Sequence, residues 1–310
     1  MSTRPGLALA AAAAVISGFA VYTNSYGVRA FGNATVYTTA KNLVAAVVLA
    51  AALAAAAYRA RRARSGHAAP QFARPRRLTQ WAGLAAVAVI GGSVPFLLFF
   101  NGLARVSSSN AAFIQKTLVV WVALLAVPLL RERVTWWHAV AIGGLIWGQA
   151  LLGGGVSGIG LGAGEVMIFA ATLMWAVETV VARKLLGDLP AVTVATARMG
   201  GGVAILIGYT FVTTGWPVLA ATGWHQWSWA IATGVILAGY VATWYAALAR
   251  AGAIDVTALL VPAAIITALL QAGSTPLAAQ WQGLAVVAMA AALIPLAARK
   301  SRRGSPAVVR

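Results

Sequence analysis

Long apolar runs follow one another along the whole chain, and each is interrupted by a short polar or Gly/Pro-rich stretch. A helix rises about 1.5 Å per residue and needs roughly 20 mostly apolar residues to cross a bilayer. Ten runs fit this requirement, over residues 6–27, 34–57, 79–102, 109–130, 136–153, 162–183, 190–211, 227–249, 255–273 and 280–298. The pattern therefore predicts an all-α integral membrane protein with ten transmembrane helices.

Composition supports a membrane protein and narrows the chemistry. Hydrophobic residues make up 61% of the chain and charged residues only 9%, whereas soluble domains are about 25% charged. The chain has no cysteine, which excludes disulfides, thiolate metal sites and cysteine nucleophiles. Its three histidines are far apart in sequence. We therefore expect no metal, no cofactor and no catalytic site.

The basic residues predict the orientation of the chain. Lysine and arginine concentrate in cytoplasmic loops, and with the N-terminus inside, 18 of the 23 basic residues fall on the cytoplasmic side. Two fall on the other side and three within spans. The chain is thus expected in the cytoplasmic membrane with both termini inside. The net charge of +18 is then a topology signal in contact with lipid, and no nucleic-acid partner is expected. The sequence also allows the protein to form a homodimer.

An internal repeat relates the two halves. An offset of 145 residues places Leu103-Ala104-Arg105 on Leu248-Ala249-Arg250 and Trp136 on Trp281. Each half then holds five spans, an odd number, so the two halves enter the membrane in opposite orientations. Such inverted repeats are typical of secondary transporters. We predict one repeat over 1–153, a second over 154–298, and a basic cytoplasmic tail over 299–310.

Particular stretches resemble a known family. The first half has a serine run, a long apolar helix and then a charged stretch before the next span, and the second half has a proline within a span. These features lie at Ser107-Ser108-Ser109, Leu130-Arg131-Glu132-Arg133-Val134-Thr135-Trp136 and Val261-Pro262. In these features the chain resembles the EamA-type transporters of the drug/metabolite transporter (DMT) superfamily. The resemblance implies a ten-helix transporter and favours efflux of amino acids or related metabolites. Thr117 stands where the first repeat usually has proline.

Ionisable residues inside a span are costly, at about 2.5–3.5 kcal/mol at the helix centre, and usually face a cavity or a partner. Lys116 lies deep in the fourth span beside Gln115. We expect it to meet the carboxylate or phosphate of a solute; the alternative is a structural ion pair. Lys41 and Arg198 lie at similar depths in the second and seventh spans, which correspond under the repeat. They either contact the solute or extend toward the interface.

Glu178 is the one acidic residue deep in a predicted span. A carboxyl group in apolar surroundings can bind and release a proton near neutral pH, which makes Glu178 the candidate proton-coupling residue. The alternative is that it neutralises Lys116, Lys41 or Arg183.

Weaker candidates complete the predicted site. Tyr22, Asn24 and Asn42 can line a cavity through hydrogen bonds, and Trp121 and Trp175 can wall a pocket or simply pack. Asp255 and Asn110 occupy matching positions at the start of the ninth and fourth spans, where we expect them to cap helices. The glycine pair Gly91-Gly92 and the triplet 200–202 permit close approach of helices.

The sequence contains no nucleotide-binding loop, so transport energy must come from a gradient or an exchanged solute. We predict a secondary active transporter that exports small organic anionic or zwitterionic metabolites. One alternative is a translocator of lipids or lipid-linked metabolites, which would need a cleft open to the lipid. An intramembrane enzyme would need paired acids or a nucleophile with a base, and a lone Glu178 supplies neither.

Overall fold

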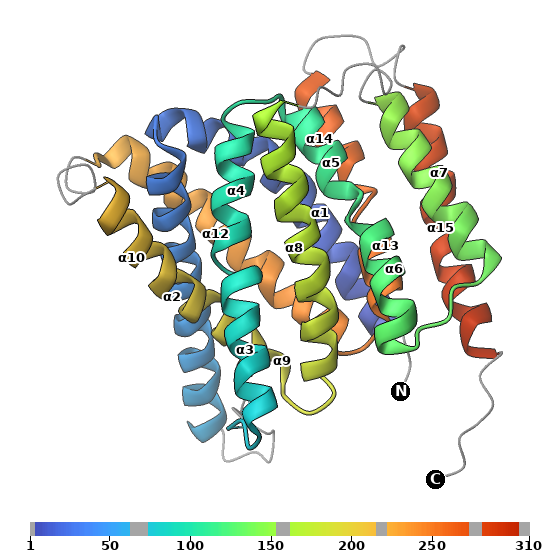
Figure 1. The fold of residues 1–310 in the computed structure, drawn as a ribbon, viewed down its shortest axis with the longest axis horizontal. Helices are drawn as coiled ribbons and strands as arrows, with labels where there is room; N and C mark the ends of the chain where they lie inside the picture. Colours follow the sequence, from blue (N-terminus) through green and yellow to red (C-terminus); the bar gives the residue numbers. More distant parts are fainter. Residues whose placement is uncertain (1–3, 63–73, 153–161, 215–221, 273–280, 304–310) are drawn as a thin grey trace.

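The computed structural model describes residues 4–62, 74–152, 162–214, 222–272 and 281–303, and every element in these ranges is helical (Figure 1). The helices run roughly alongside one another as a bundle. The start of α1 and the end of α15 lie at the same end of this bundle (Figure 1). The predicted topology requires this relation, although the orientation relative to a membrane stays a prediction.

Seven helical stretches within the described ranges are long and apolar enough to cross a membrane. Four of them are single helices: α1 (Arg4–Phe31), α2 (Ala34–Arg62), α8 (Ala163–Leu185) and α12 (Trp224–Leu248). The other three are built from consecutive pieces: α3 (Leu78–Ile90) with α4 (Val94–Leu103), α5 (Ser108–Lys116) with α6 (Leu118–Leu130), and α9 (Ala191–Thr196) with η2 (Ala197–Gly201) and α10 (Gly202–Thr214). Together they establish a multi-pass membrane protein.

The remaining three predicted spans also fall on helices, but these are shorter or interrupted. They are α7 (Trp136–Leu152), the pair α13 (Ala253–Ala258) and α14 (Ala263–Ala272), and α15 (Trp281–Arg303). The count of ten spans therefore stays a prediction. The boundary predicted at 153 and residues 304–310 of the predicted tail lie outside the described residues, and α15 continues through 299–303.

Two helix breaks lie at positions that the repeat relates. The fourth span breaks at Thr117, between α5 and α6, and the ninth breaks around Pro262, between α13 and α14. The same offset of 145 residues joins these two positions. Proline interrupts a helix because it lacks an N–H group and its ring clashes with the preceding turn. Thr117 breaks its helix without that chemistry, and its hydroxyl group donates to the Ile114 carbonyl at 2.7 Å.

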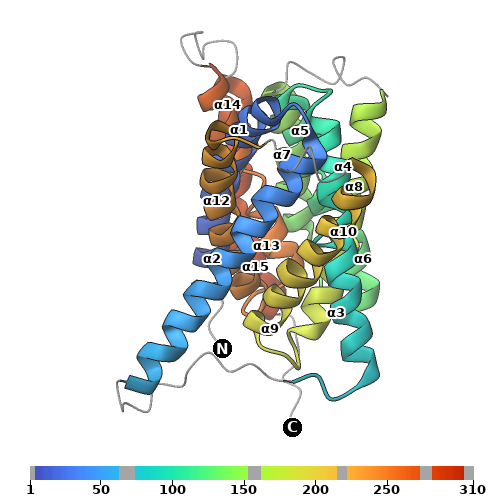
Figure 2. The same cartoon turned by 90° about the vertical axis from the view of Figure 1, so that its left-hand side faces the viewer.

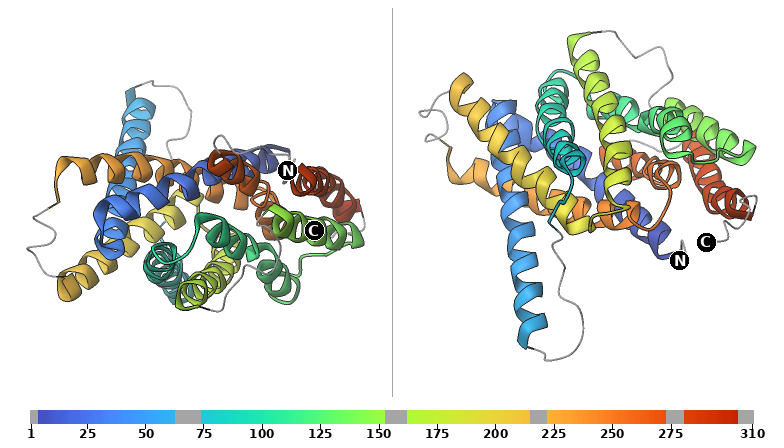
Figure 3. Two further views of the ribbon diagram at one scale, coloured as in Figure 1. Left: turned by 90° about the horizontal axis from the view of Figure 1, so that it is seen from above. Right: turned by 60° about the horizontal axis from the view of Figure 1, so that its bottom comes forward.

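The helices form two layers with the centre of the bundle between them. In one layer α1 packs along α12, and in the other α4 packs along α8 (Figures 2 and 3). The pair α7 and α15 flanks this bundle, and its helices pack mainly against each other (Figure 1). Side chains that point inward from α1, α12, α4 and α8 therefore face one another across the centre.

The helix caps differ from the prediction. Ser107 caps α5, where its Oγ accepts the Asn110 backbone N–H at 3.2 Å. At α13 the cap position is Gly252 and Asp255 lies within the first turn, where its Oδ1 is 3.0 Å from His138 Nε2. Asp255 therefore joins α13 to α7, a contact that a sequence pattern cannot show because the two residues are far apart in the chain.

Candidate functional site

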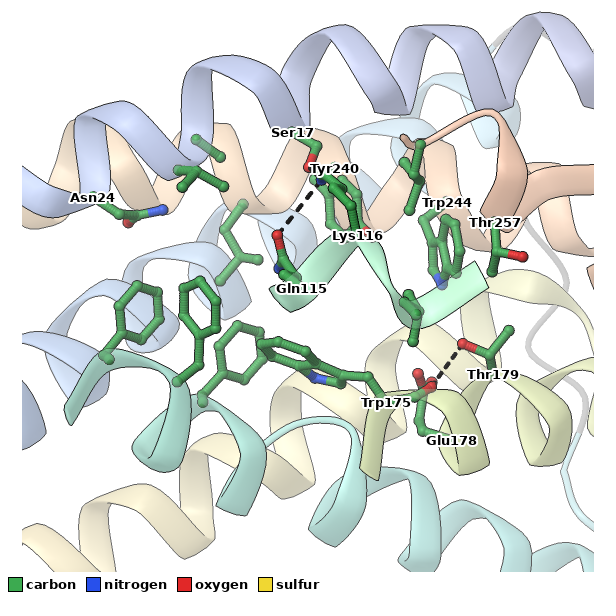
Figure 4. A pocket seen from close by; sticks show the side chains of 18 of the residues that line it. Ser17, Asn24, Gln115, Lys116, Trp175, Glu178, Thr179, Tyr240, Trp244 and Thr257 are labelled. Atoms are coloured by element: carbon green, nitrogen blue, oxygen red, sulfur yellow. Dashed lines mark hydrogen bonds between the residues drawn. The ribbon is translucent and has the colours of Figure 1, made fainter. Parts of the chain in front are cut away.

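A cavity lies between the two layers (Figure 4). Its volume is about 860 Å³ when the open space at its mouth is included. Eight of the predicted spans line it, and none of the lining residues within the described structure comes from α7 or α15. The lining residues are Ser17, Ala20, Val21, Asn24, Lys41, Phe96, Phe99, Phe100, Gln115, Lys116, Leu118, Trp175, Glu178, Thr179, Arg198, Thr233, Leu237, Tyr240, Trp244, Thr257, Leu260 and Val261.

Lys116 forms one wall of the cavity at the point where the fourth span breaks. It is the last residue of α5, and its side chain is buried, with 3% of its surface exposed. Its Nζ donates to Ser17 Oγ at 3.0 Å and lies 3.5 Å from Gln115 Oε1 (Figure 4). The two oxygens leave one of the three donors of an ammonium group open to a ligand.

Arg198 and Glu178 form a second cluster, on η2 and α8. Arg198 lies in the π-helical turn η2, a type of irregularity that often marks functional sites. Its Nε is 3.9 Å from Glu178 Oε1, and the Tyr245 hydroxyl group donates to the same carboxylate oxygen. Among the described residues, the Nε and Nη1 atoms of Arg198 have no hydrogen-bond partner. The carboxylate is thus held by two groups, while the guanidinium group keeps unused donors.

Lys41 is enclosed by aromatic rings. Its side chain is 2% exposed, and Nζ lies 3.9 Å from the ring centre of Phe100, 5.6 Å from that of Phe96 and 5.8 Å from that of Tyr37. Arg198 faces the same Phe96 ring, with Cζ 5.4 Å from its centre. Cations over aromatic faces are attracted by the ring quadrupole, more strongly where water is excluded. Phe96 therefore lies beside both cations.

Aromatic side chains cover the rest of the wall. Phe96 and Phe99 both pack against Trp175, with ring centres 5.4 Å apart in each case. Tyr240 and Trp244 stack at 5.8 Å on the facing helix α12. The Trp175 Nε1–H donates to the Gly91 carbonyl at 3.2 Å, which fixes the ring at the break between α3 and α4. Such a wall suits the apolar part of a small organic molecule.

A sequence model of the EamA-like transporter family matches the chain over residues 4–154 and again over 162–296. The chain belongs to the EamA-like transporter family. It is therefore a membrane transporter of the DMT type, as the sequence resemblance implied, and members of this family are generally not enzymes.

The solved structures agree on the fold. Twenty-nine chains of solved structures match this transporter. One, described only as the crystal structure of a protein, is 18% identical, with a TM-score of 0.68 over 92% of this chain and 98% of its own. At this identity the likeness shows the fold alone. No curated protein matches the sequence significantly.

The cavity of this EamA-like transporter brings together most of the predicted site residues. Seven of them line it: Lys116, Gln115, Lys41, Arg198, Trp175, Asn24 and Glu178. Glu178 meets Arg198, a partner that the sequence did not single out, and lies beyond ion-pair distance of Lys116, Lys41 and Arg183.

Three predicted residues do not line the cavity. The Tyr22 hydroxyl group bonds to that of Tyr26 at 2.9 Å. Asn42 is buried against its own helix, where Nδ2 donates to the Thr38 carbonyl at 2.7 Å. Trp121 donates to Thr117 Oγ1 at 3.3 Å and packs on Phe169. None of the three is a lining residue, because the rotation of each helix about its axis, which tertiary packing sets, decides which of its side chains reach the cavity.

Other residues that line the cavity or bond to its charged side chains were missed by the sequence analysis. Ser17 and Tyr245 bond directly to Lys116 and Glu178, yet a lone serine or tyrosine in an apolar span carries no distinguishing pattern. The aromatic run at Phe96, Phe99 and Phe100 did carry a signal, because three phenylalanines within five positions are dense even for a membrane helix.

The predicted close approach at Gly91-Gly92 positions Arg198. A Cβ atom added to Gly92 would lie 2.0 Å from the Arg198 carbonyl oxygen. We expect Gly92→Ala to push η2 away from α3, to cost about 3 kcal/mol of stability or more, and to lower transport. Thermal unfolding in detergent measures the first effect and uptake the second.

The matched control is Gly208→Ala in α10, which belongs to the same span as Arg198. A Cβ atom there has no neighbour within 4 Å, so the substitution should be tolerated. Equal thermal midpoints for the two variants would contradict the proposed packing.

Proposed function

We propose that this protein is a secondary active exporter of small organic anionic or zwitterionic metabolites, such as amino acids, across the cytoplasmic membrane. The observation that carries the proposal is the cavity itself, where three buried cations and one acid from both halves of the chain surround a single aromatic-walled space. A site between two repeats near the middle of the bundle is what alternating access requires. The absence of a nucleotide-binding loop from the sequence points to a gradient as the energy source.

The proposed architecture is ten helices in two inverted five-helix repeats with both termini inside. Two features support it. The family matches twice, once in each half. The breaks at Thr117 and Pro262 also lie at corresponding positions, and their helices pack together, α13 against α6 and α14 against α5. Broken helices around a central site are a common arrangement in such transporters.

A contact between the two halves supports alternating access. Glu132, just after α6, accepts the backbone N–H groups of Ala253 and Ile254 at 2.7 and 3.1 Å, where α13 begins. In the proposed topology this contact closes the cytoplasmic end of the bundle. An alternating-access cycle must break it, because the cavity has to open toward the cytoplasm to receive solute.

Glu132→Gln is therefore expected to favour the inward-open state, since a neutral amide accepts from the start of a helix less strongly than a carboxylate. The natural chain has no cysteine, so Thr257→Cys on the cavity wall can report accessibility without further substitutions. We expect a membrane-impermeant thiol reagent applied from the cytoplasmic side to label this cysteine several-fold faster in the Glu132→Gln background. Unchanged labelling would show that Glu132 does not hold the cavity closed. Glu165→Gln serves as the matched control, because it makes the same change to a glutamate at the start of a different helix, in the first turn of α8.

The function is tested by solute retention. Cells with and without the protein are loaded with a panel of amino acids, organic acids and cationic drugs, and retention is compared. We expect faster loss of anionic or zwitterionic solutes in cells that carry the protein. Unchanged solute retention together with faster crossing of labelled lipid would favour the lipid translocator instead.

A further inference from the structure

The acidic residues of the chain can be accounted for completely. There are five, and all lie within the described residues. Four are outside the cavity: Glu132 just after α6, Glu165 in the first turn of α8, Asp188 beside Gln80, and Asp255 beside His138. Glu178 is thus the one acidic side chain on the cavity wall.

Glu178 is already engaged, so two of the three cavity cations have no acidic partner. Its carboxylate is held by Arg198 and by the Tyr245 hydroxyl group. No acidic side chain in the chain lies within 4.0 Å of Lys41 Nζ or Lys116 Nζ. A buried charge without a counter-charge is strongly unfavourable. When both lysines are protonated, the cavity has two positive charges without an acidic partner, and an anionic ligand can neutralise them.

The two uncompensated lysines belong to different walls. Lys116 is fixed to α1 through Ser17, whereas Lys41 shares the Phe96 ring with Arg198. Figure 4 shows Lys116 and Glu178, the partner of Arg198, entering the cavity from different walls. A single compact anion can meet one of these positions, but two separated anionic groups are needed to meet both.

Arg198 adds an independent indication of a ligand. It lines the cavity, 3% of its surface is exposed, and two of its nitrogen atoms have no hydrogen-bond partner within the described structure. Buried donors are almost always satisfied, and an unpaired one costs about 1–3 kcal/mol. Guanidinium donors match the two oxygens of a carboxylate, so a carboxylate beside Lys41 would satisfy them.

Resting on the proposed transport function, we propose that the cavity selects a small organic dicarboxylate. One carboxylate binds Lys116 beside Ser17 and Gln115. The other binds Arg198 and Lys41, and the carbon chain lies against Phe96, Phe99 and Trp175. A neutral zwitterion would pair its carboxylate with one lysine but would add a positive charge of its own, and a monocarboxylate would leave one lysine uncompensated. A dicarboxylate neutralises both.

Binding of succinate to the purified full-length protein in detergent tests this, compared with succinamate, in which one carboxylate is replaced by an amide. We expect succinate to bind about 30-fold more tightly or better, the ratio that corresponds to losing one buried charge contact. Alanine should compete weakly. Inorganic phosphate should also compete weakly, because its charges sit at one place. Equal affinity for succinate and succinamate, or phosphate competing as well as succinate, would overturn the proposal.

Variants locate the two ends. Lys116→Met and Lys41→Met should each remove most of the preference for succinate over succinamate, while Lys116→Arg and Lys41→Arg should retain it. The arginine variants keep the proposal testable if a methionine variant does not fold. Lys184→Met is the matched control, because Lys184 is exposed at the end of α8, away from the cavity. An unchanged preference in both methionine variants would also overturn the proposal.

The outcome for binding is separable from that for transport. A protein that binds succinate but moves no solute in proteoliposomes would support the dicarboxylate site and contradict the proposed function. A protein that transports amino acids with no preference for a second carboxylate would do the reverse.

Discussion

Lys116→Ala is expected to abolish transport, reducing initial uptake into proteoliposomes by about 100-fold or more. Losing one partner of a buried charge contact usually costs about 2–5 kcal/mol, and Lys116 is the cavity cation that Ser17 and Gln115 hold in place. The substitution also removes the deep charge that must face a wet cavity or a partner to be tolerated in a membrane. We expect the affinity for the solute to fall together with the rate.

The comparison variants separate this role from a structural one. Lys184→Ala, at the exposed end of α8, should transport at the wild-type rate. Lys116→Ala should retain its thermal midpoint or even raise it, because a buried cation without an acidic partner destabilises the empty protein. Wild-type transport by Lys116→Ala would rule out the proposed site.

Glu178→Gln is expected to uncouple transport from a pH gradient. Glutamine keeps the shape of the side chain and its contact with Tyr245 but cannot carry a proton. In proteoliposomes with an imposed gradient, the wild type should accumulate solute and the variant should only equilibrate it. Continued accumulation by Glu178→Gln would show that the proton, if one is coupled, moves elsewhere.

The same substitution should also destabilise the protein, because it leaves Arg198 buried without its counter-charge. Removing one partner of a buried pair typically costs about 3–5 kcal/mol, whereas removing both is often close to neutral. Thermal unfolding of Glu178→Gln, Arg198→Gln and the double variant measures this directly. We expect the double variant to recover most of the stability lost in either single one. Additive losses would mean that the two residues at 3.9 Å do not act as a pair.

Much of the fold could be predicted because the bilayer imposes a simple rule on sequence. A spanning helix must satisfy its backbone groups internally and present apolar side chains to lipid, so every predicted span falls on a helix. The break at Pro262 was visible for a similar reason, since proline acts locally. The break at Thr117 was not, because a threonine at that position interrupts a helix only in the context of its neighbours.

The site divides in the same way. The sequence pointed to Lys41, Lys116, Glu178 and Arg198, because a charge inside an apolar span is costly wherever the chain later places it. It did not show that Glu178 pairs with Arg198 or that Phe96 lies beside two cations. Nor did it show that Asn42 and Trp121 are not among the residues that line the cavity.

The sequence alone thus determined that this is a helical membrane protein with rare buried charges, because hydrophobicity and charge act on each residue separately. Only the tertiary structure decided which charges meet. Pairing depends on the rotation and depth of each helix against its neighbours, and these are set by packing between segments far apart in the chain.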